Sequence, residues 1–425
     1  MQNTRPSSSN PPPPAAAEGG SSRRVYLDSN ATTRPSAAAV AAARRGMEEA
    51  WGNPSSVHRT GQAARRAMEL ARAQVATLIG AKPAEVVFTS GGTEANRLAL
   101  EGVLQLATGR GQPAVLLTTP VEHAAVREPA AALERRGVAV RRLPVDGHGV
   151  LDPDDLAAAY GEAPEEAAVL ASVHWANNET GVIQPIEALA AVAAAAAADR
   201  AATTRFHTDA TQAVGKLPVD LRTGGPLDGV DLLTLSAHKL YAVKGSGALF
   251  VRRRVRLAGV ASGGPQERGL RAGTENLAGI LALGAAADES AAYLADPAAS
   301  AGLAARRDRF EAAVRAAMPG AVVPAGGARF GRLANTANIA FPGLLAEAIL
   351  LGLSERGVDA SAGAACSSGS LEPSPVLLAM GLAEPLAHGS VRFSLSRHTT
   401  DAELDEAVAA LAATVGRLGR LLPTG

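Results

Sequence analysis

The sequence predicts an α/β protein. From Val25 onward, short apolar runs rich in β-branched residues alternate with alanine-rich stretches whose leucines and valines recur at helical spacing. Several of the apolar runs lead directly into clusters of polar residues, which is typical of parallel strands whose carboxyl ends carry a site. The chain has 425 residues, 47% of them hydrophobic, which is enough apolar material for two or three domains with their own cores.

The elements of the first predicted domain follow these runs in order. Alanine supplies helix propensity in the predicted helices, and leucine or valine supplies the buried stripe. Strands are predicted at residues 85–89, 114–119, 167–173, 205–208 and 231–235, and helices at residues 61–79, 95–104 and 185–202.

A change in composition over residues 288–303 predicts a domain boundary, because acidic residues, a proline and small residues interrupt the alternation there. We expect a large domain over residues 25–290, a smaller α+β domain over residues 291–425, and an N-terminal segment, residues 25–35, that packs on the smaller domain. Residues 1–24, rich in Ser and Pro, are expected to form a disordered tail. Strands of the smaller domain are predicted at residues 321–323, 336–341 and 390–395, and a helix at residues 401–421.

Charge and cysteine counts exclude several classes of function. The 41 basic and 41 acidic residues balance, so no net field would collect nucleic acid or an anionic membrane surface. Cys366 is the single cysteine, which excludes an internal disulfide and a Cys-x-x-Cys site. Charge-free apolar stretches such as residues 188–198 and 277–287 are shorter than the roughly 18 to 20 residues that span a bilayer, so no membrane helix is expected. The expected location is the cytoplasm, and the arginines of residues 1–24 leave organellar targeting as a minor alternative.

Four of the predicted strands end in polar clusters. Because ligands of an open parallel sheet bind beyond the carboxyl ends of its strands, the clusters are expected to share one site. They are Glu122-His123, His174 with Asn177-Asn178-Glu179, Asp209 with Gln212, and Ser236-Ala237-His238-Lys239.

A glycine turn lies between a predicted strand and a predicted helix. Ser90-Gly91-Gly92-Thr93-Glu94 follows the strand at residues 85–89, and the unpaired N–H groups of such a helix start suit a phosphate. The motif lacks the lysine of a P-loop and the spacing of a dinucleotide fingerprint. A phosphate site and a simple strand-to-helix turn therefore both remain open from this motif alone.

Lys239 and Asp209 extend the candidate site. A lysine among polar groups can lose its proton and form a Schiff base with an aldehyde cofactor, although a lone lysine is more often merely solvated. Asp209 suits the protonated ring nitrogen of pyridoxal phosphate, so lysine, carboxylate and phosphate cradle form a set. His123 either stacks on such a ring and moves protons or serves as a helix cap or core histidine.

Three further motifs carry a chemical interpretation. His207 and Asp209 form a fragment of a metal site, but without a cysteine cluster or a His-Glu-x-x-His motif we expect no metal. Cys366 lies in a run of small residues, 361–370, which favours an exposed loop with a reactive thiol over a buried inert one. Arg392 interrupts a predicted strand and either clamps a carboxylate bidentately or forms an ordinary salt bridge.

Together these residues resemble the cysteine desulfurases of the NifS and IscS type, pyridoxal-phosphate enzymes of the class V aminotransferase family. The resemblance covers nearly the whole chain beyond residues 1–24. Its motifs are Tyr26-Leu-Asp-Ser-Asn-Ala-Thr-Thr33, Gly52-Asn-Pro-Ser-Ser-Val-His58, Thr89-Ser-Gly-Gly-Thr-Glu94, Glu122-His123, Asn177-Asn-Glu-Thr-Gly181, Asp209-Ala-Thr-Gln212, Ser236-Ala-His-Lys239, Gln266-Glu-Arg-Gly-Leu-Arg-Ala-Gly-Thr-Glu-Asn276, Cys366-Ser-Ser-Gly-Ser-Leu-Glu-Pro373 and Arg392-Phe-Ser-Leu-Ser-Arg397.

The resemblance implies the type I fold of pyridoxal-phosphate enzymes, with a mainly parallel seven-stranded sheet in the large domain. It implies that Lys239 carries the cofactor, that Asp209 pairs with the pyridine nitrogen, and that His123 stacks on the ring. The other implied contacts are Asn178 and Gln212 with the ring oxygen, Gly92, Thr93, Ser236 and His238 with the phosphate, joined by Thr274 of a neighbouring subunit, and Arg392 with the substrate carboxylate, helped by Asn30.

The implied reaction removes sulfur from L-cysteine and gives L-alanine and a persulfide on Cys366, with Lys239 and His123 as proton carriers. The implied partners are a second copy of this chain, in a homodimer, and an iron–sulfur scaffold or another sulfur acceptor. The segment around Cys366 is similar to the longer loop of desulfurases that serve iron–sulfur cluster assembly. The alternatives are a selenocysteine lyase or a conventional aminotransferase of the same fold, which would not need Cys366, and, more remotely, a catalytically silent homologue.

One motif departs from the family pattern. After Tyr241 the family usually has Gly-Pro-Lys, whereas this chain has Ala242-Val243-Lys244. Glycine and proline preset a turn, so their loss leaves the conformation beside Lys239 open.

Overall fold

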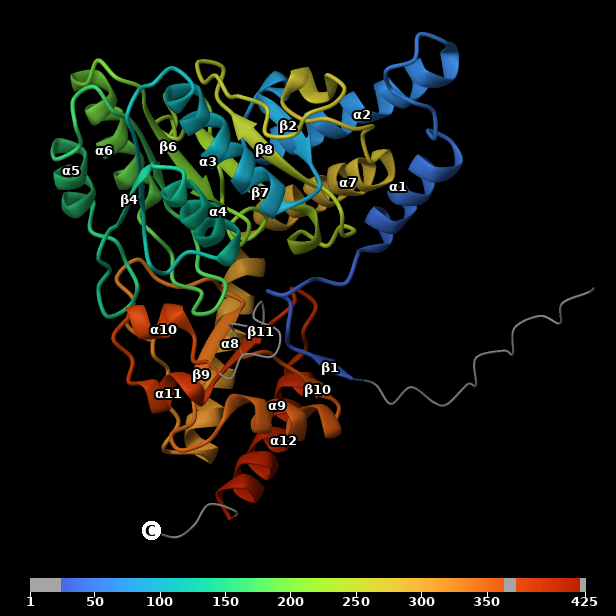
Figure 1. Cartoon of the computed structure of the whole chain (residues 1–425). Coiled ribbons are helices and arrows are strands. Elements are labelled where there is room, and N and C mark those ends of the chain that lie inside the picture. Colours follow the sequence, from blue (N-terminus) through green and yellow to red (C-terminus); the bar gives the residue numbers. More distant parts are fainter. Residues whose placement is uncertain (1–23, 363–371, 421–425) are drawn as a thin grey trace, which may run out of the picture.

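A seven-stranded sheet forms the centre of the larger part of the molecule (Figure 1). The structure is a computed structural model that describes residues 24–362 and 372–420. The strand order is β2-β8-β7-β6-β5-β3-β4, in which β8 runs antiparallel to both neighbours and the remaining pairs are parallel. This confirms the predicted α/β class with a mainly parallel sheet. The strands are β2 (Val86–Thr89), β3 (Ala114–Thr118), β4 (Ala139–Arg142), β5 (Ala168–Ser172), β6 (Thr204–Asp209), β7 (Leu232–Ser236) and β8 (Gly247–Val251).

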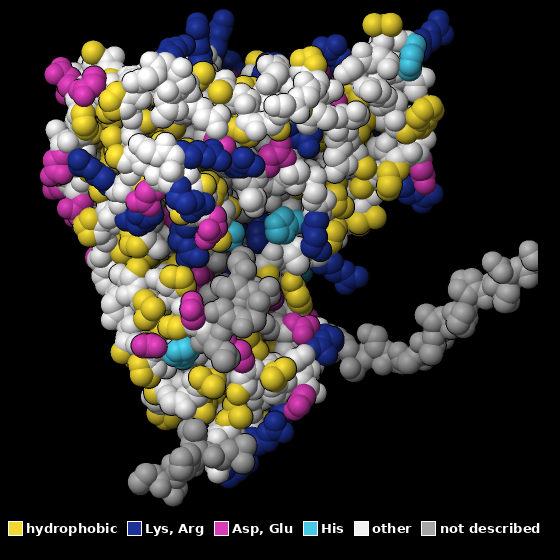
Figure 2. Space-filling view, in the orientation of Figure 1, with side chains coloured by type: hydrophobic (Ala, Val, Ile, Leu, Met, Phe, Trp, Pro, Cys, Tyr) yellow, Lys and Arg dark blue, Asp and Glu magenta, His cyan; other side chains and the backbone are white. Residues whose placement is uncertain are grey.

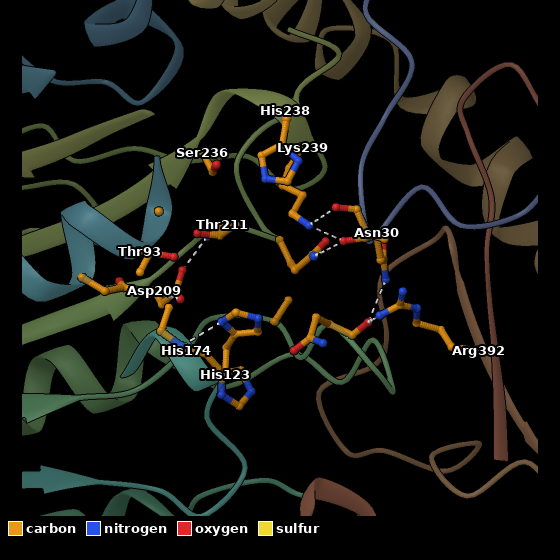
Figure 3. A pocket seen from close by; sticks show the side chains of 17 residues that line it. Asn30, Thr93, His123, His174, Asp209, Thr211, Ser236, His238, Lys239 and Arg392 are labelled. Carbon is orange, nitrogen blue, oxygen red and sulfur yellow. Dashed lines mark hydrogen bonds between the residues drawn. The ribbon is translucent and has the colours of Figure 1, made fainter. Parts of the chain in front are cut away.

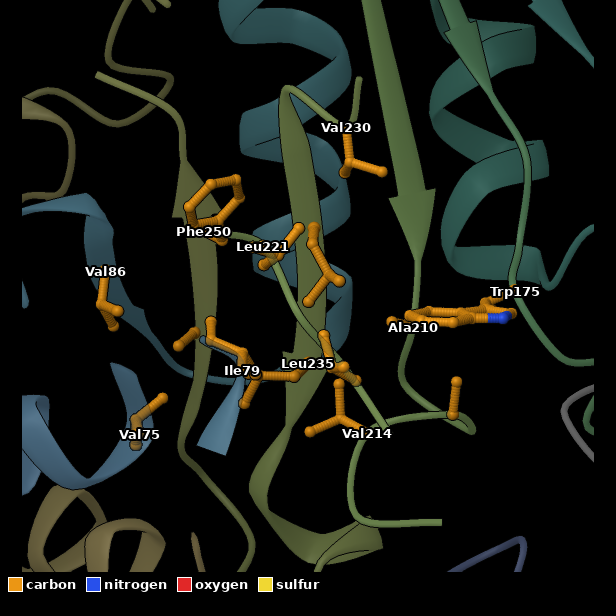
Figure 4. Packing of buried hydrophobic residues seen from close by; sticks show 14 of the residues in the cluster. Val75, Ile79, Val86, Trp175, Ala210, Val214, Leu221, Val230, Leu235 and Phe250 are labelled. Carbon is orange, nitrogen blue, oxygen red and sulfur yellow. The ribbon is translucent and has the colours of Figure 1, made fainter. Parts of the chain in front are cut away.

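Helices cover both faces of this sheet, and its side chains alternate between two hydrophobic cores. Leu116 of β3 belongs to the core shared with α3 (Gly92–Thr108) and α4 (Ala124–Arg135), whereas its neighbours Val115 and Leu117 belong to the core on the other face. This alternation is the period of two expected of a strand buried on both sides. Figure 4 shows part of the second core. Its helices are α1 (Ala37–Glu48), α2 (Arg59–Leu78), α5 (Pro153–Gly161), α6 (Ile186–Asp199) and α7 (Leu277–Leu294).

The predicted elements agree with the structure at most positions. The helices predicted at residues 61–79 and 185–202 are α2 and α6, and the predicted strands match β2, β3, β5, β6 and β7 within a residue or two. The prediction at residues 321–323 is wrong, because Val322 forms only an isolated bridge with Ala340. β4 and β8 were not predicted.

One helix in the described part of the chain, α7, is long and apolar enough by length and composition to cross a membrane. The sequence prediction considered only residues 277–287 and did not anticipate this length. The helix packs against α1 and α2, and 56% of it is buried. We therefore interpret α7 as a core helix.

A separate hydrophobic core joins the N-terminal segment to the C-terminal part of the chain. Val25 and Leu27 pack with residues between Leu303 and Leu411, and β1 (Val25–Tyr26) pairs in parallel with β10 (Val358–Asp359). β9 (Thr336–Ala340) and β11 (Ser390–Ser394) form an antiparallel pair in the same region. The surrounding helices are α8 (Pro297–Ala317), α9 (Ala346–Glu355), α10 (Pro375–Ala379), α11 (Glu384–His388) and α12 (Asp401–Gly419).

His207, two residues before Asp209 on β6, hydrogen-bonds to the strands on both sides. The ring is fully buried, its Nδ1 lies 2.8 Å from Oγ of Ser172 on β5, and its Nε2 lies 3.1 Å from Oγ1 of Thr234 on β7. A neutral imidazole has one donor and one acceptor nitrogen, and two hydroxyls satisfy both. Burial lowers the pKa of His207 to about 4, so the residue is a structural part of the sheet.

We expect this buried neutral ring to make folding stability depend on pH. Between about pH 6.5 and pH 4 the unfolded chain binds a proton at His207 that the folded chain does not, so acid lowers the free energy of unfolding by up to about 1.4 kcal/mol per pH unit. In His207→Asn this contribution is absent, and the urea unfolding free energy should fall less steeply over the same window. Equal slopes for the two proteins would contradict a neutral buried His207.

Candidate active site

A cavity of about 340 Å³ lies beyond the carboxyl ends of the parallel strands and is also lined by Arg392 of β11. Figure 3 shows the side chains that line it. The polar residues at the carboxyl ends of the parallel strands meet in this cavity, as the sequence predicts, and residues of the N-terminal segment and of β11 join them there. The predicted residues among them are Asn30, Gly92, Thr93, His123, Asn178, Asp209, Gln212, Ser236, His238, Lys239 and Arg392.

The remaining two predicted site residues are Thr274 and Cys366. Thr274 is exposed, lies in the stretch before α7, and is not among the residues that line the cavity of its own chain. Cys366 lies outside the described residues.

Lys239 ends a short 3-10 turn, η2 (Ala237–Lys239), that begins directly after β7. Its Nζ donates to the backbone carbonyls of Asn30 at 2.5 Å and Ala31 at 2.6 Å. The amine is thus aimed across the cavity wall at the N-terminal segment (Figure 3). Two neutral acceptors hold its position here, so its location depends on the path of residues 30–31.

The turn after Lys239 forms without the Gly-Pro pair of the family pattern. Tyr241 takes the left-handed conformation, with φ of 64°, which is unusual for a residue other than glycine. Its N–H donates to Oγ1 of Thr33 at 2.8 Å, and its Oη accepts from the N–H of Arg397 at 2.9 Å. The Arg397 guanidinium lies 4.2 Å from the centre of the Tyr241 ring, a cation–π contact. These contacts hold the turn, and buried Ala242 closes it by donating to the carbonyl of Ala237 at 3.2 Å.

Asp209 presents an oriented carboxylate at the end of β6. Its Oδ2 accepts from Nδ2 of Asn96 at 2.7 Å, and its Oδ1 accepts from the N–H of Thr211 at 2.9 Å. Asn96 is fully buried on α3 and was missed by the sequence analysis. A polar amide on the apolar face of a helix is a usable signal, because such a group is rarely buried without a partner.

His123 both caps a helix and lines the cavity. Its Nδ1 accepts from the N–H of Ala125 at 3.0 Å at the start of α4, which assigns the proton of the neutral ring to Nε2. Burial lowers the pKa of His123, and the charge of Lys239 lowers it further, while Asp209 opposes both. The ring is therefore neutral at pH 7.

His174 and Glu122 form a pair that the sequence analysis grouped at the strand ends without assigning a role. Oε1 of Glu122 lies 3.1 Å from Nδ1 of His174, and the same carboxylate accepts from the His174 N–H and from Oγ1 of Thr119. Nε2 of His174 is buried without a hydrogen-bond partner in the described structure, at the cavity. The buried carboxylate fixes how this second imidazole faces the cavity.

The glycine turn opens α3 onto the same cavity. A side chain on Gly92 would place its Cβ 2.9 Å from Oγ1 of Thr211 and 3.5 Å from Cβ of Ser236, so the backbone approaches the opposite wall closely. Oγ1 of Thr211 is buried and has no hydrogen-bond partner in the described structure. His238 lies at this end, 3.2 Å from Oγ1 of Thr32 through its Nδ1, and burial, with the charges of Lys239 and Lys244, lowers its pKa to about 4.

Arg392 on β11 forms the opposite end of the cavity. Its Nη2 donates to Oδ1 of Asp28 at 2.6 Å, its Nη1 donates to the carbonyl of Asn178 at 3.1 Å, and its buried Nε has no partner among the described residues. Asn30 donates its Nδ2 hydrogens to the carbonyl of Asn178 and to Oγ1 of Thr336. Contact between the Asn30 side chain and a substrate carboxylate therefore requires one of these bonds to open.

No group of three or more His, Asp, Glu or Cys side chains in the described ranges is arranged to hold a metal ion. The sequence analysis paired His207 with Asp209 as a fragment of a metal site. In the structure, both ring nitrogens of His207 lie within hydrogen-bond distance of the hydroxyls of Ser172 and Thr234.

Comparisons with known proteins agree with this geometry. The model of the aminotransferase class-V family matches residues 25–407. A cysteine desulfurase of Trichormus variabilis is 45% identical over 378 residues, which is 89% of each chain. A solved structure described as a NifS-like protein is 31% identical and has a TM-score of 0.81, covering 94% of this chain and 100% of its own. SspA, solved in complex with cysteine, is 31% identical with a TM-score of 0.73 over 88% of this chain and 99% of its own. The chain therefore belongs to the aminotransferase class-V family and, within it, to the cysteine desulfurases.

Proposed function

We propose that the protein uses pyridoxal phosphate to remove sulfur from L-cysteine, giving L-alanine, and that Cys366 receives the sulfur. The observation that carries this proposal is one cavity in which Lys239, Asp209 and Arg392 face a shared space between a glycine turn and β11. These groups are an amine for an aldehyde, a carboxylate for a ring nitrogen, and a guanidinium for a substrate carboxylate. The structure of SspA with cysteine supports the choice of substrate.

The residues at the glycine turn fit the phosphate of this cofactor. The N-terminus of α3 offers unpaired N–H groups and the positive end of a 17-residue helix. The unpartnered Oγ1 of Thr211 and the Cβ-free space at Gly92 lie beside it. Gly92, Thr93, Ser236 and His238 would hold the phosphate here, and the low pKa of His238 makes it a neutral hydrogen-bonding group.

The residues around Asp209 fit the pyridine ring. Asn96 and the N–H of Thr211 occupy one site on each carboxylate oxygen of Asp209, which leaves further lone pairs for a protonated ring nitrogen. His123 would stack on the ring, and Asn178 and Gln212 would hydrogen-bond its oxygen. When bound, pyridoxal phosphate supplies an electron sink for the carbon that carries the amino group.

The chain's own residues bind the substrate and move its protons. Arg392 holds the carboxylate of L-cysteine through its unpartnered Nε, while Asp28 and Asn178 fix the guanidinium plane. Lys239 lines the same cavity, and its Nζ would serve as base and acid for the α-carbon. Nε2 of His123 is a second proton carrier, because burial keeps its ring neutral.

The sulfur-transfer step belongs to Cys366. Its thiolate attacks the sulfur of L-cysteine, so that an S–S bond forms as the bond between Cβ and sulfur breaks, and the electron pair left on Cβ takes up one proton to complete the methyl group of alanine. The described residues on either side of this segment are hydrogen-bonded to Arg392, which lines the cavity, and to Glu179, which follows the lining residue Asn178. Ser361 exchanges backbone hydrogen bonds with Arg392 at 3.1 and 2.7 Å, and Oγ of Ser374 donates to Oε2 of Glu179 at 2.5 Å. Both attachments support a thiol tethered within reach of the cavity.

We further propose a homodimer that passes its sulfur to an iron–sulfur scaffold or another acceptor protein. Large hydrophobic side chains are exposed along α1, α2 and their connection, and Figure 2 shows hydrophobic atoms over this region. The exposed position of Thr274 supports a role in a neighbouring subunit's site. The exposed residues are Val40, Met47, Trp51, Val57 and Leu70, with exposed fractions between 52% and 88%.

Replacing Lys239 tests the cofactor directly. Purified protein loaded with pyridoxal phosphate should be yellow, and borohydride should fix the colour-bearing group to the chain. Lys239→Ala should lose the borohydride-stable attachment and at least about 10²-fold in activity, because both the covalent anchor and a positioned base are removed. Mass spectrometry of the reduced protein measures the attachment. Borohydride-fixed cofactor in Lys239→Ala at the same yield as in the wild type would contradict the assignment of Lys239 as the residue that carries the cofactor.

Replacing Cys366 separates desulfuration from its alternatives. Cys366→Ser keeps the size of the side chain but not the nucleophile, so alanine production from L-cysteine should fall by more than about 10³-fold. If the protein were instead a selenocysteine lyase or an aminotransferase, selenide release from L-selenocysteine or amino transfer would not need the thiol and should persist in this variant. Alanine production that survives in Cys366→Ser, with the cofactor spectrum unchanged, would favour a selenocysteine lyase or an aminotransferase instead.

A further inference from the structure

Lys216 lies behind the wall of the cavity rather than in it. Its Nζ donates to Oε1 of Gln212 at 2.6 Å and to Oδ1 of Asn30 at 3.2 Å. Gln212 and Asn30 line the cavity, whereas Lys216 lines a smaller adjoining space of about 30 Å³, large enough for about one water molecule, that Lys239 also reaches. Lys216 is therefore separated from a bound substrate by one layer of amide side chains.

The bonds of Lys216 help to fix which way both amides face. The Lys216 amine donates to Oε1 of Gln212 and the backbone carbonyl of Asn30 can only accept, so Oε1 of Gln212 faces Lys216 and Nε2 faces the other way. One Nε2 hydrogen goes to the carbonyl of Asn30 at 3.0 Å, and the second is left for the cavity. The same logic fixes Asn30, whose Oδ1 also accepts from Nδ2 of Asn335 at 2.9 Å.

The charges around Lys216 are mostly of its own sign. Burial lowers the pKa of Lys216 well below its ordinary value, and the neighbouring cations Lys239 and Arg392 lower it further. Asp28 on the N-terminal segment is occupied by Arg392, and no carboxylate forms a salt bridge with Lys216 among the described residues. An uncharged amine still donates two hydrogen bonds, so the two contacts survive loss of the charge.

We propose that Lys216 is a positioning residue that orients the amide of Gln212, so that a Gln212 N–H faces the ring oxygen of the cofactor bound to Lys239. Lys216 touches neither the cofactor nor the substrate and acts through Gln212 and Asn30. This inference rests on the proposed function, because it assumes the pyridoxal phosphate site described above. An N–H that faces the ring oxygen favours its anionic form, and with Lys216 in place the Lys239 linkage gives up its proton at a lower pH.

The test is a spectroscopic pH titration of the loaded protein. Lys216→Met keeps the length of the side chain and removes both donors, so the amide of Gln212 can turn its oxygen to the cavity. We expect the midpoint of the visible absorbance change of the Lys239-bound cofactor to rise by about one pH unit. Lys216→Arg retains donors for both amides, and its midpoint should stay at or below that of the wild type.

A double-mutant cycle shows whether the effect passes through Gln212. Gln212→Met alone should also raise the midpoint, and Lys216→Met combined with Gln212→Met should raise it no further, because residues that act through one another are not additive. Lys82→Met, a change at an exposed lysine that does not line the cavity, is the matched control and should leave the midpoint unchanged. Additive shifts would contradict the proposal.

The outcomes distinguish this inference from the proposed function. A wild-type protein with no visible cofactor band overturns the proposed function and this inference with it. A normal band whose midpoint does not move in Lys216→Met, while the melting temperature falls, shows that Lys216 only supports the fold. If Lys216→Met does not fold, Lys216→Gln replaces it. The shorter amide cannot reach both acceptors, so its midpoint should also rise, and an unmoved midpoint would count equally against the inference.

Discussion

The hydrogen bonds of Asn30 join the N-terminal segment to the loops that follow the central strands and to the C-terminal core. Its carbonyl accepts from Lys239 and from Gln212, its Oδ1 accepts from Lys216 and Asn335, and its Nδ2 donates to the carbonyl of Asn178 and to Thr336. Its N–H donates to Oγ of Ser394 on β11. A single buried residue therefore links the sheet edge, the N-terminal segment and the C-terminal core. The sequence resemblance places Asn30 beside the substrate, and the structure shows that its donors and acceptors are already used to hold the walls of the cavity together.

The electrostatics of the cavity follow from burial. Lys216, Lys239 and Arg392 surround the Asn30 end, where Arg392 is held by Asp28 and Asn178. Burial lowers the pKa of His123 and His238, so both imidazoles are uncharged at neutral pH, and the positive charge that would face a substrate carboxylate is that of Arg392. A substrate carboxylate at Arg392 and a phosphate at the glycine turn would each meet a site of complementary sign. The ring between them would have Asp209 as its carboxylate partner.

Local signals were sufficient to predict most of the architecture. Alternating apolar runs indicated the parallel strands, and the polar residues at their ends correctly placed Asp209, His123 and Lys239 at one edge of the sheet. β8 (Gly247–Val251) is a short, fully buried apolar run of the kind that indicates a strand, and the sequence analysis overlooked it. Its antiparallel direction depends on which strands it joins. β4 escaped because its side chains are exposed or half-buried and its sequence, Ala139–Arg142, ends in two arginines.

The supporting residues of the site could not be predicted in the same way. Asn96 and Asp209 are 113 positions apart, and Lys216 and Asn30 are 186 positions apart, so only the fold reveals that they meet. The place of Asn96 on the apolar face of a helix indicates burial but does not identify its partner, and Lys216 is a single polar residue in a turn, where a solvated side chain is the ordinary expectation. The residues that face the cavity are recognisable from motifs, whereas the residues behind them depend on packing between distant elements.

The measurement that tests the central claim most directly is a product balance. The protein loaded with pyridoxal phosphate is incubated with L-cysteine and a thiol reductant, and alanine and sulfide are measured in the same samples. We predict that both form in equal amounts over repeated turnovers, because each sulfur taken by Cys366 leaves one alanine behind. Sulfide accompanied by pyruvate and ammonia in place of alanine, or alanine without sulfide, would contradict the account.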